Sequence, residues 1–243
     1  MRHPYQVDFM AIGAHADDVE LTCGGTIAKM TNSGQTGVLV DMTKASAATR
    51  GSVETRMEEA KASAQVLGVQ ERLNLGFPDA KLQCNEETVY AVAELIRKYR
   101  PKLILTHVIS DYHPDHNTTH QIVKEAWYKA GLRALEIQGE AFRAHRLIYF
   151  IGAEALEPDF AVDISDYWQT KMEAMACFPS QFAVKGTEEF EGNTYISSNA
   201  FMEKFEARHR VLGLKILKKY AEGFQMEFLP EIEHPGLLEG ETY

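Results

Sequence analysis

The chain has 243 residues, with 35 acidic and 25 basic side chains and a formal net charge of -10. Its 45% hydrophobic and 25% charged residues are typical of a globular protein with a sizeable core and argue against a disordered chain, a collagen or a coiled coil. The negative charge argues against nucleic acid as a partner, and no apolar stretch approaches the about 20 residues of a membrane helix.

Strand and helix patterns alternate through the first half of the chain. Runs of apolar and β-branched residues predict buried strands, and apolar residues at helical spacing predict the helices between them. Asn85 is expected to cap one helix, and Gly34 and Gly68 are expected to end two others. Strands are predicted at 7–14, 37–42, 72–75 and 103–108, and helices at 24–31, 53–67, 86–99 and 118–130.

The second half of the chain continues with fewer elements. We predict strands at 146–152 and 160–164, a helix after Asp166, a long helix at 199–220, and a tail over the last twenty residues. Alternating strands and helices predict a Rossmann-like α/β fold, in which helices cover both faces of a mostly parallel sheet. We therefore expect one domain over 1–243, with an α/β core over about 1–150 and C-terminal strands, helices and the tail over about 151–243.

Histidines and carboxylates cluster after the first and fourth predicted strands. The first cluster is Gly-Ala-His-Ala-Asp-Asp-Val-Glu at 13–20, and the second is Asp-Tyr-His-Pro-Asp-His at 111–116. Parallel strands would bring both clusters to the carboxyl edge of the sheet, where such folds bind ligands. Taken singly, Asp17 and Asp18 could serve only the dipole of a helix, and the second cluster could be a polar loop. Together they offer His15, Asp17, Asp18, Glu20, His113, Asp115 and His116.

Converging imidazole and carboxylate groups favour a divalent metal site. A catalytic zinc needs three nitrogen or oxygen ligands and one open position, which two histidines and one aspartate would satisfy, although iron or manganese could also bind. A dinucleotide site is disfavoured, because Gly13-x-His15 is not GxG and the carboxylates would repel a pyrophosphate. A nucleotide-binding domain without hydrolase activity and an inactive zinc-binding protein remain as alternatives. We expect the other histidines, His107 among them, to be structural.

These motifs resemble a known family. Ala-His-Ala-Asp-Asp-Val-Glu at 14–20 and His-Pro-Asp-His at 113–116 resemble the two signatures of the LmbE-like, or PIG-L, zinc N-deacetylases. The segment 49–56, and 195–208 with its Tyr-Ile-Ser-Ser and Phe-Glu-Ala-Arg, look like the bacillithiol-biosynthesis branch, which deacetylates N-acetylglucosaminyl-malate. The resemblance covers nearly the whole chain. One departure is Ala16, where the family usually has proline.

The resemblance implies roles for the clustered residues. His15, Asp18 and His116 would hold zinc, and Asp17 would be the general base. This fits the chemistry of zinc, which lowers the pKa of water and polarises an amide carbonyl. His113, potentially oriented by Asp115, would stabilise the oxyanion, although Asp115 could equally make a turn bond within its loop.

The substrate side chains rest on weaker signals. Lys44, Arg50 and Arg56 could be solvated loop charges, or they could form a positive approach for an anionic malate glycoside. The resemblance places Arg56 against substrate or acetate and makes Tyr195 a hydrogen-bond donor. The alternative substrate is another N-acetyl sugar, such as a chitooligosaccharide.

The remaining expectations concern the surroundings of the protein. Three cysteines without CxxC spacing indicate free thiols and a cytoplasmic location. We expect a small N-acetyl sugar as the binding partner, with neither nucleic acid nor membrane. By family analogy we also expect a homo-oligomer, a hexamer.

Overall fold

The computed structural model describes residues 3–47, 50–152, 157–182 and 194–229. Its strands are β1 (Phe9–Gly13), β2 (Gly37–Thr43), β3 (Glu71–Phe77), β4 (Leu103–His107), β5 (Arg146–Phe150), β6 (Phe160–Asp163) and β7 (Ala221–Met226). Within the described residues they form a sheet in the order β3-β2-β1-β4-β5-β7-β6. Strands β1 to β5 are parallel, and β7 runs antiparallel to both β5 and β6. The predicted mostly parallel α/β sheet is therefore confirmed.

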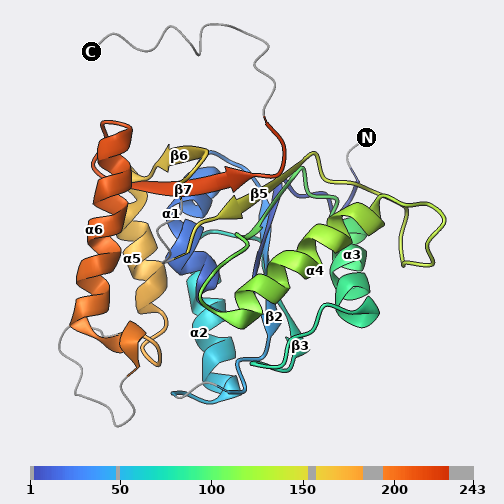
Figure 1. Cartoon of the computed structure of the whole chain (residues 1–243), viewed down its shortest axis with the longest axis horizontal. Helices are drawn as coiled ribbons and strands as arrows, with labels where there is room; N and C mark the ends of the chain where they lie inside the picture. Colours follow the sequence, from blue (N-terminus) through green and yellow to red (C-terminus); the bar gives the residue numbers. More distant parts are fainter. Residues whose placement is uncertain (1–2, 48–49, 153–156, 183–193, 230–243) are drawn as a thin grey trace, which may run out of the picture.

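Helices cover both faces of this sheet (Figure 1). They are α1 (Asp18–Asn32), α2 (Val53–Val66), α3 (Glu86–Tyr99), α4 (Pro114–Ala130), α5 (Trp168–Ala176) and α6 (Asn199–Lys215), with short 3-10 turns η1 (Ser165–Tyr167) and η2 (Tyr195–Ser197). Successive residues of β1 face opposite layers, since side chains alternate along a strand. Met10 packs with Val92 of α3 and Ile122 of α4, whereas Phe9 packs with Ile27 of α1. No helix in the described part of the chain has the length and apolar character needed to cross a membrane.

Helix α3 has the bounds and the cap that the sequence predicts. The Asn85 side chain accepts the Thr88 N–H, and the Thr88 hydroxyl accepts the Asn85 N–H, which completes a capping box. The helix ends at Tyr99, and the next residue, Arg100, adopts a left-handed conformation with φ of 46° just before Pro101. Local chemistry thus determined both ends of this helix.

Two helices begin earlier than predicted, and both carry the polar clusters. Helix α1 begins at Asp18, within the first cluster, and α4 begins at Pro114, within the second. His113 caps α4, because its ring nitrogen accepts the Asp115 N–H, and proline is well suited to the first helical position. Each cluster therefore lies at the amino end of a helix.

The prediction was wrong at the end of the long helix and for the strand that follows it. Helix α6 ends at Lys215 and not at residue 220, and residues 221–226 form a strand, β7, where none was predicted. The strand pattern is masked because Glu222 and Gly223 are both poor strand formers. Glu222 can be buried in β7 because its carboxylate pairs with Lys171, 2.6 Å away, and accepts two backbone N–H groups of α1, and no local pattern reveals these partners. The predicted tail beyond residue 229 lies outside the described residues.

Candidate metal centre

The two polar clusters meet at the carboxyl ends of β1 and β4. These strands are parallel neighbours, and Ile12 pairs with Thr106 one residue before each strand ends. The chain then leaves β1 into α1 and leaves β4 through a short loop into α4. Parallel pairing therefore brings the clusters together at the edge of the sheet where α/β folds bind their ligands.

Asp18 lies buried at the centre of this cluster. Its Oδ2 atom is 3.5 Å from Nδ1 of His15, and its Oδ1 atom is 3.2 Å from Nε2 of His116. Ligand atoms around one tetrahedral zinc are separated by about 3.3 Å, given bonds of about 2.0 Å. The His15 backbone N–H also donates to Oδ2 at 2.7 Å and holds the carboxylate in place. Asp18 thus lies next to both predicted histidine ligands, through a different oxygen in each case.

Carboxylates contact the far side of both histidine rings. Nε2 of His15 lies 3.1 Å from Oδ1 of Asp79 and 3.4 Å from Oδ2 of Asp115. Nδ1 of His116 lies 2.9 Å from Oδ1 of Asp111. A carboxylate that accepts the N–H of one ring nitrogen leaves the lone pair of the other nitrogen available to a metal, and metal-binding histidines commonly have this arrangement.

The charges around the histidines favour a bound cation. Burial alone lowers the pKa of His15, but hydrogen bonds to Asp115, Asp18 and Asp79 outweigh it and raise that pKa well above its usual value. Burial also lowers the pKa of His116, but the charge of Asp18 and the hydrogen bond to Asp111 outweigh this effect and raise the pKa to about 9. The same carboxylates would stabilise a divalent cation, so the donor atoms and the local charge fit such an ion.

Three sets of side chains in the described part of the chain have ligand atoms close enough to share one ion. The atoms of each set all lie within 4.8 Å of one another, and every set contains His15, His116 or both. The sets are His15 with His113 and His116, Asp18 with His107 and His116, and His15 with Asp79 and Asp115. The predicted combination of His15, Asp18 and His116 is not itself one of these sets, but at least one of its histidines occurs in each set and Asp18 belongs to one of them.

His107, which the sequence suggested to be structural, lies directly behind Asp18. Its Nε2 atom is 3.1 Å from both the Ala14 backbone nitrogen and Oδ2 of Asp18. Its ring stacks on that of His116 with the centroids 4.0 Å apart. Burial lowers the pKa of His107 to about 4, so the ring is neutral at pH 7. It packs against the carboxylate and the neighbouring histidine ring on the core side.

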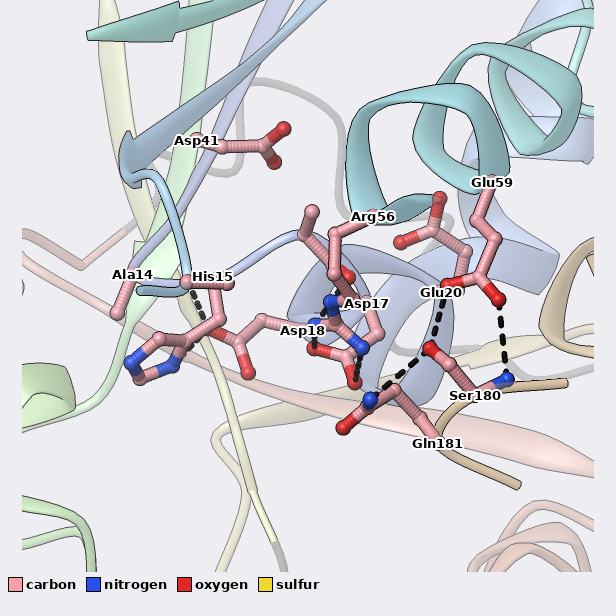
Figure 2. A network of polar contacts seen from close by, with 12 residues as sticks. Ala14, His15, Asp17, Asp18, Glu20, Asp41, Arg56, Glu59, Ser180 and Gln181 are labelled. Atoms are coloured by element: carbon pink, nitrogen blue, oxygen red, sulfur yellow. Dashed lines mark hydrogen bonds and ion pairs between the residues drawn. The ribbon is translucent and has the colours of Figure 1, made fainter. Parts of the chain in front are cut away.

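Asp17 points away from the histidines and toward α2 (Figure 2). Its oxygens lie 3.3 and 3.4 Å from the guanidinium of Arg56, which also donates to the Ala16 carbonyl at 2.8 Å. Burial raises the pKa of Asp17 to about 6, although the charge of Arg56 opposes the shift. Arg56, predicted to meet a substrate, is 3% exposed and holds the turn that carries Asp17, and its role toward a substrate stays a prediction.

His113 and Asp115 make a contact different from the one expected. The Asp115 carboxylate accepts the Ala80 N–H at 2.7 Å and faces His15, whereas the Asp115 backbone N–H donates to Nδ1 of His113 at 3.2 Å. A nitrogen that accepts a hydrogen bond carries no proton, so the proton of neutral His113 is on Nε2. Burial and the nearby His15 lower the pKa of His113, which favours this neutral donor form.

Glu20 is separated from the metal cluster, although the sequence offered it as a candidate. Its Oε1 atom accepts from Arg72 and from the Ser63 hydroxyl, at 2.5 Å each. Arg72 in turn makes a two-pronged contact with Asp41 at 2.8 and 2.9 Å. This buried network links α1 to α2, β2 and β3, so Glu20 has a structural role.

The predicted substrate residues lie at varied positions. Lys44 is exposed and lines a cavity of about 430 Å³ together with Arg56. Arg50 is half-buried in the segment before α2. Tyr195 is 57% exposed at the start of η2 and contacts the Phe201 ring edge-on, with the centroids 5.6 Å apart. Among the described residues, no contact joins Lys44 or Tyr195 to the histidines, and their roles toward a substrate stay predictions.

Sequence reasoning missed the residues that orient the two ligand rings. Asp111 belongs to the second polar cluster, but the sequence suggested no role for it. Asp79 follows β3 in the turn Gly-Phe-Pro-Asp at 76–79. The rule that ligand sites gather beyond strand ends could have identified Asp79, because β3 lies two strands away from β1 in the same parallel sheet.

Comparison with known proteins agrees with this geometry. The sequence profile of the family "PIG-L: GlcNAc-PI de-N-acetylase" matches residues 10–127. A diacetylchitobiose deacetylase of Thermococcus kodakarensis is 32% identical over 237 residues, which cover 92% of this chain and 83% of the relative. A probable N-acetyl-alpha-D-glucosaminyl L-malate deacetylase 2 of Bacillus anthracis is 30% identical over 138 residues, 55% of this chain and 58% of the relative.

The fold also matches a solved structure along almost its full length. The crystal structure of the conserved protein TT1542 from Thermus thermophilus has a TM-score of 0.85 and 30% identity, and the match covers 95% of this chain and 98% of that one. The matched profile spans both polar clusters that form the candidate metal centre. The chain is therefore a member of the PIG-L, or LmbE-like, family of N-acetyl-sugar deacetylases.

Proposed function

We propose that this protein hydrolyses the N-acetyl group of an N-acetylglucosaminyl glycoside, with a divalent metal, zinc by preference, held by His15, Asp18 and His116. The main support is the arrangement around Asp18, where two histidines present one nitrogen each and have the other nitrogen held by a carboxylate. A zinc ion bound there would supply Lewis-acid chemistry, which polarises an amide carbonyl and lowers the pKa of water.

Asp17 and His113 supply the proton transfers and charge stabilisation that such a hydrolysis needs. Asp17 adjoins the ligand Asp18 and is not itself a proposed ligand, so we assign its carboxylate, which Arg56 holds, to take a proton from the attacking water and return it to the leaving amine. His113, with its proton on Nε2, is a neutral donor for the oxygen that becomes negative as water adds to the carbonyl. Arg56 keeps Asp17 in position.

Two substrates have support, and we propose N-acetylglucosaminyl-malate first. The malate carboxylates would need cationic partners, and Lys44 and Arg50 precede α2 in an otherwise acidic chain. The second candidate is diacetylchitobiose, which is favoured by the relative that matches over 92% of this chain.

A substrate panel tests both levels of this proposal. We expect the zinc-loaded protein to release acetate from at least one of the two compounds, and chelation to abolish release. Turnover of neither compound by zinc-replete protein would contradict the deacetylase proposal. Turnover of diacetylchitobiose alone would refute the malate proposal and leave the deacetylase reaction standing.

A charge variant separates the two substrates further. We expect Lys44→Ala to raise KM for the malate glycoside several-fold and to leave KM for diacetylchitobiose unchanged, because only the first is an anion. Lys98→Ala, in α3, is the matched control. An equal effect of Lys44→Ala on both substrates would argue against a charge contact.

A further inference from the structure

Helix α1 is broken at Cys23, five residues after the candidate ligand Asp18. Cys23 has φ of -134° and ψ of 16°, values outside the helical region, whereas helix continues on both sides. In an unbroken helix the Gly25 N–H would donate to the Leu21 carbonyl. A break therefore needs other partners for the backbone groups at the two facing helix ends.

A buried ion pair from distant parts of the chain supplies those partners. The Glu222 carboxylate, from β7, accepts the N–H groups of Gly25 at 3.0 Å and Thr26 at 2.7 Å. The Lys171 ammonium, from α5, donates to the carbonyls of Glu20 at 2.9 Å and Leu21 at 3.0 Å.

The charges of Lys171 and Glu222 are oriented favourably toward the dipoles of the two half-helices. Nζ of Lys171 is 2.6 Å from Oε1 of Glu222, and both side chains are wholly buried. The anion lies at the amino end of the second half-helix and the cation at the carboxyl end of the first, which is the favourable orientation toward each helix dipole. The helical hydrogen bond from the Gly25 N–H to the Leu21 carbonyl is thus replaced by two others. The Leu21 carbonyl accepts from Lys171, and the Gly25 N–H donates to Glu222.

A glycine makes room for a neighbour beside this break. A Cβ atom at Gly25 would lie 2.8 Å from Cδ1 of Ile164, too close for any real side chain, whereas one at Gly24 would make an ordinary contact 3.5 Å from Cγ of Lys171. Gly25 therefore permits the close approach of Ile164.

The first half-helix is a short, internally hydrogen-bonded segment that begins at the two aspartates. The Leu21 N–H donates to the Asp17 carbonyl at 3.0 Å, and the Thr22 hydroxyl donates to the Asp18 carbonyl at 2.6 Å. The direction of this unit decides where the two aspartates point. Since Lys171 binds its last carbonyls, the ion pair sets that direction.

We propose that Lys171 and Glu222 are positioning residues that cap the break in α1 and thereby orient Asp17 and Asp18 for metal binding and catalysis. The proposal rests on the assignment of His15, Asp18 and His116 as ligands. It predicts that the orientation of the charges matters, and not only the presence of an ion pair in the core.

Cobalt binding tests this, because the visible spectrum of Co²⁺ reports the geometry of its ligands. We expect Lys171→Met and Glu222→Gln to weaken Co²⁺ binding at least tenfold and to alter its spectrum, in the range of about 10- to 100-fold known for residues that orient metal ligands. We expect the exchange Lys171→Glu with Glu222→Lys to be no better than the single variants. It keeps opposite charges but turns an ammonium toward N–H groups and a carboxylate toward carbonyls.

Arg97→Met is the matched control. Arg97 is buried and donates to the carbonyls of Ala130 and Leu132, at the end of α4 opposite to His113 and His116. It should lower the unfolding temperature and leave Co²⁺ affinity unchanged.

The outcomes separate this inference from the proposed function. Normal Co²⁺ affinity and spectrum in folded Glu222→Gln, or full recovery in the exchanged pair, would overturn the positioning role. Failure of the unaltered protein to bind Co²⁺ would instead overturn the metal assignment itself.

Discussion

The carboxylates behind the histidines give a graded prediction about metal affinity. Within the described residues, Nδ1 of His116 is held by Asp111 alone, whereas Nε2 of His15 has two carboxylate neighbours, Asp79 and Asp115. Loss of such a partner typically weakens metal binding by about 10- to 100-fold, or about 1.4–2.7 kcal/mol. We therefore expect Asp111→Asn to fall near the upper end of that range. Asp79→Asn should fall near the lower end, because Asp115 still orients the ring.

The measurement is a zinc titration against a chromophoric chelator at pH 7. Asp163→Asn is the control, since Asp163 is also partly buried and accepts two hydrogen bonds, both from Ser165, but lies in β6. It should leave zinc affinity unchanged. Unaltered affinity in Asp111→Asn, or a larger loss in Asp79→Asn than in Asp111→Asn, would refute the reasoning that these carboxylates orient the ligand rings.

Three further predictions follow from the same structure. Asp17→Asn should retain stoichiometric zinc but lower kcat by orders of magnitude, because it removes the proton acceptor and keeps the ligands; near-normal turnover would exclude Asp17 as the base. His116→Ala should lose stoichiometric zinc in elemental analysis, and retained zinc would remove His116 from the ligand set. Burial, together with the charges of Lys171 and Arg208, holds the pKa of His209 well below its usual value. Below about pH 6.5, His209 therefore binds a proton in the unfolded chain but stays neutral in the folded chain. The free energy of unfolding should then fall as the pH drops, by up to about 1.4 kcal/mol per pH unit. Urea denaturation of metal-free protein at pH 7 and pH 5.5 should show a smaller pH effect in His209→Gln, and an equal effect would contradict this account.

Much of the fold could be predicted because its signals are local. The capping box at Asn85 and Thr88 set the start of α3, and unbroken apolar runs identified β1, β2 and β4 as buried parallel strands. Parallel connectivity then implied that the clusters after β1 and β4 would meet, which the structure bears out. Strand β7 was not predicted, because Glu222 interrupts the apolar pattern of its sequence.

The sequence by itself determined which groups are available for chemistry and at which edge of the sheet they gather. Residue type and strand order suffice for that, since hydrophobic periodicity decides which segments are buried strands and parallel pairing aligns their ends. Only the tertiary structure decided how each group is held: Arg56 beneath Asp17, Asp79 and Asp111 behind the ligand rings, and Lys171 with Glu222 inside the broken α1. The physical reason is that a buried charge is stable only beside a partner with the right geometry, and each of these partners except Asp111 comes from a segment distant in the chain.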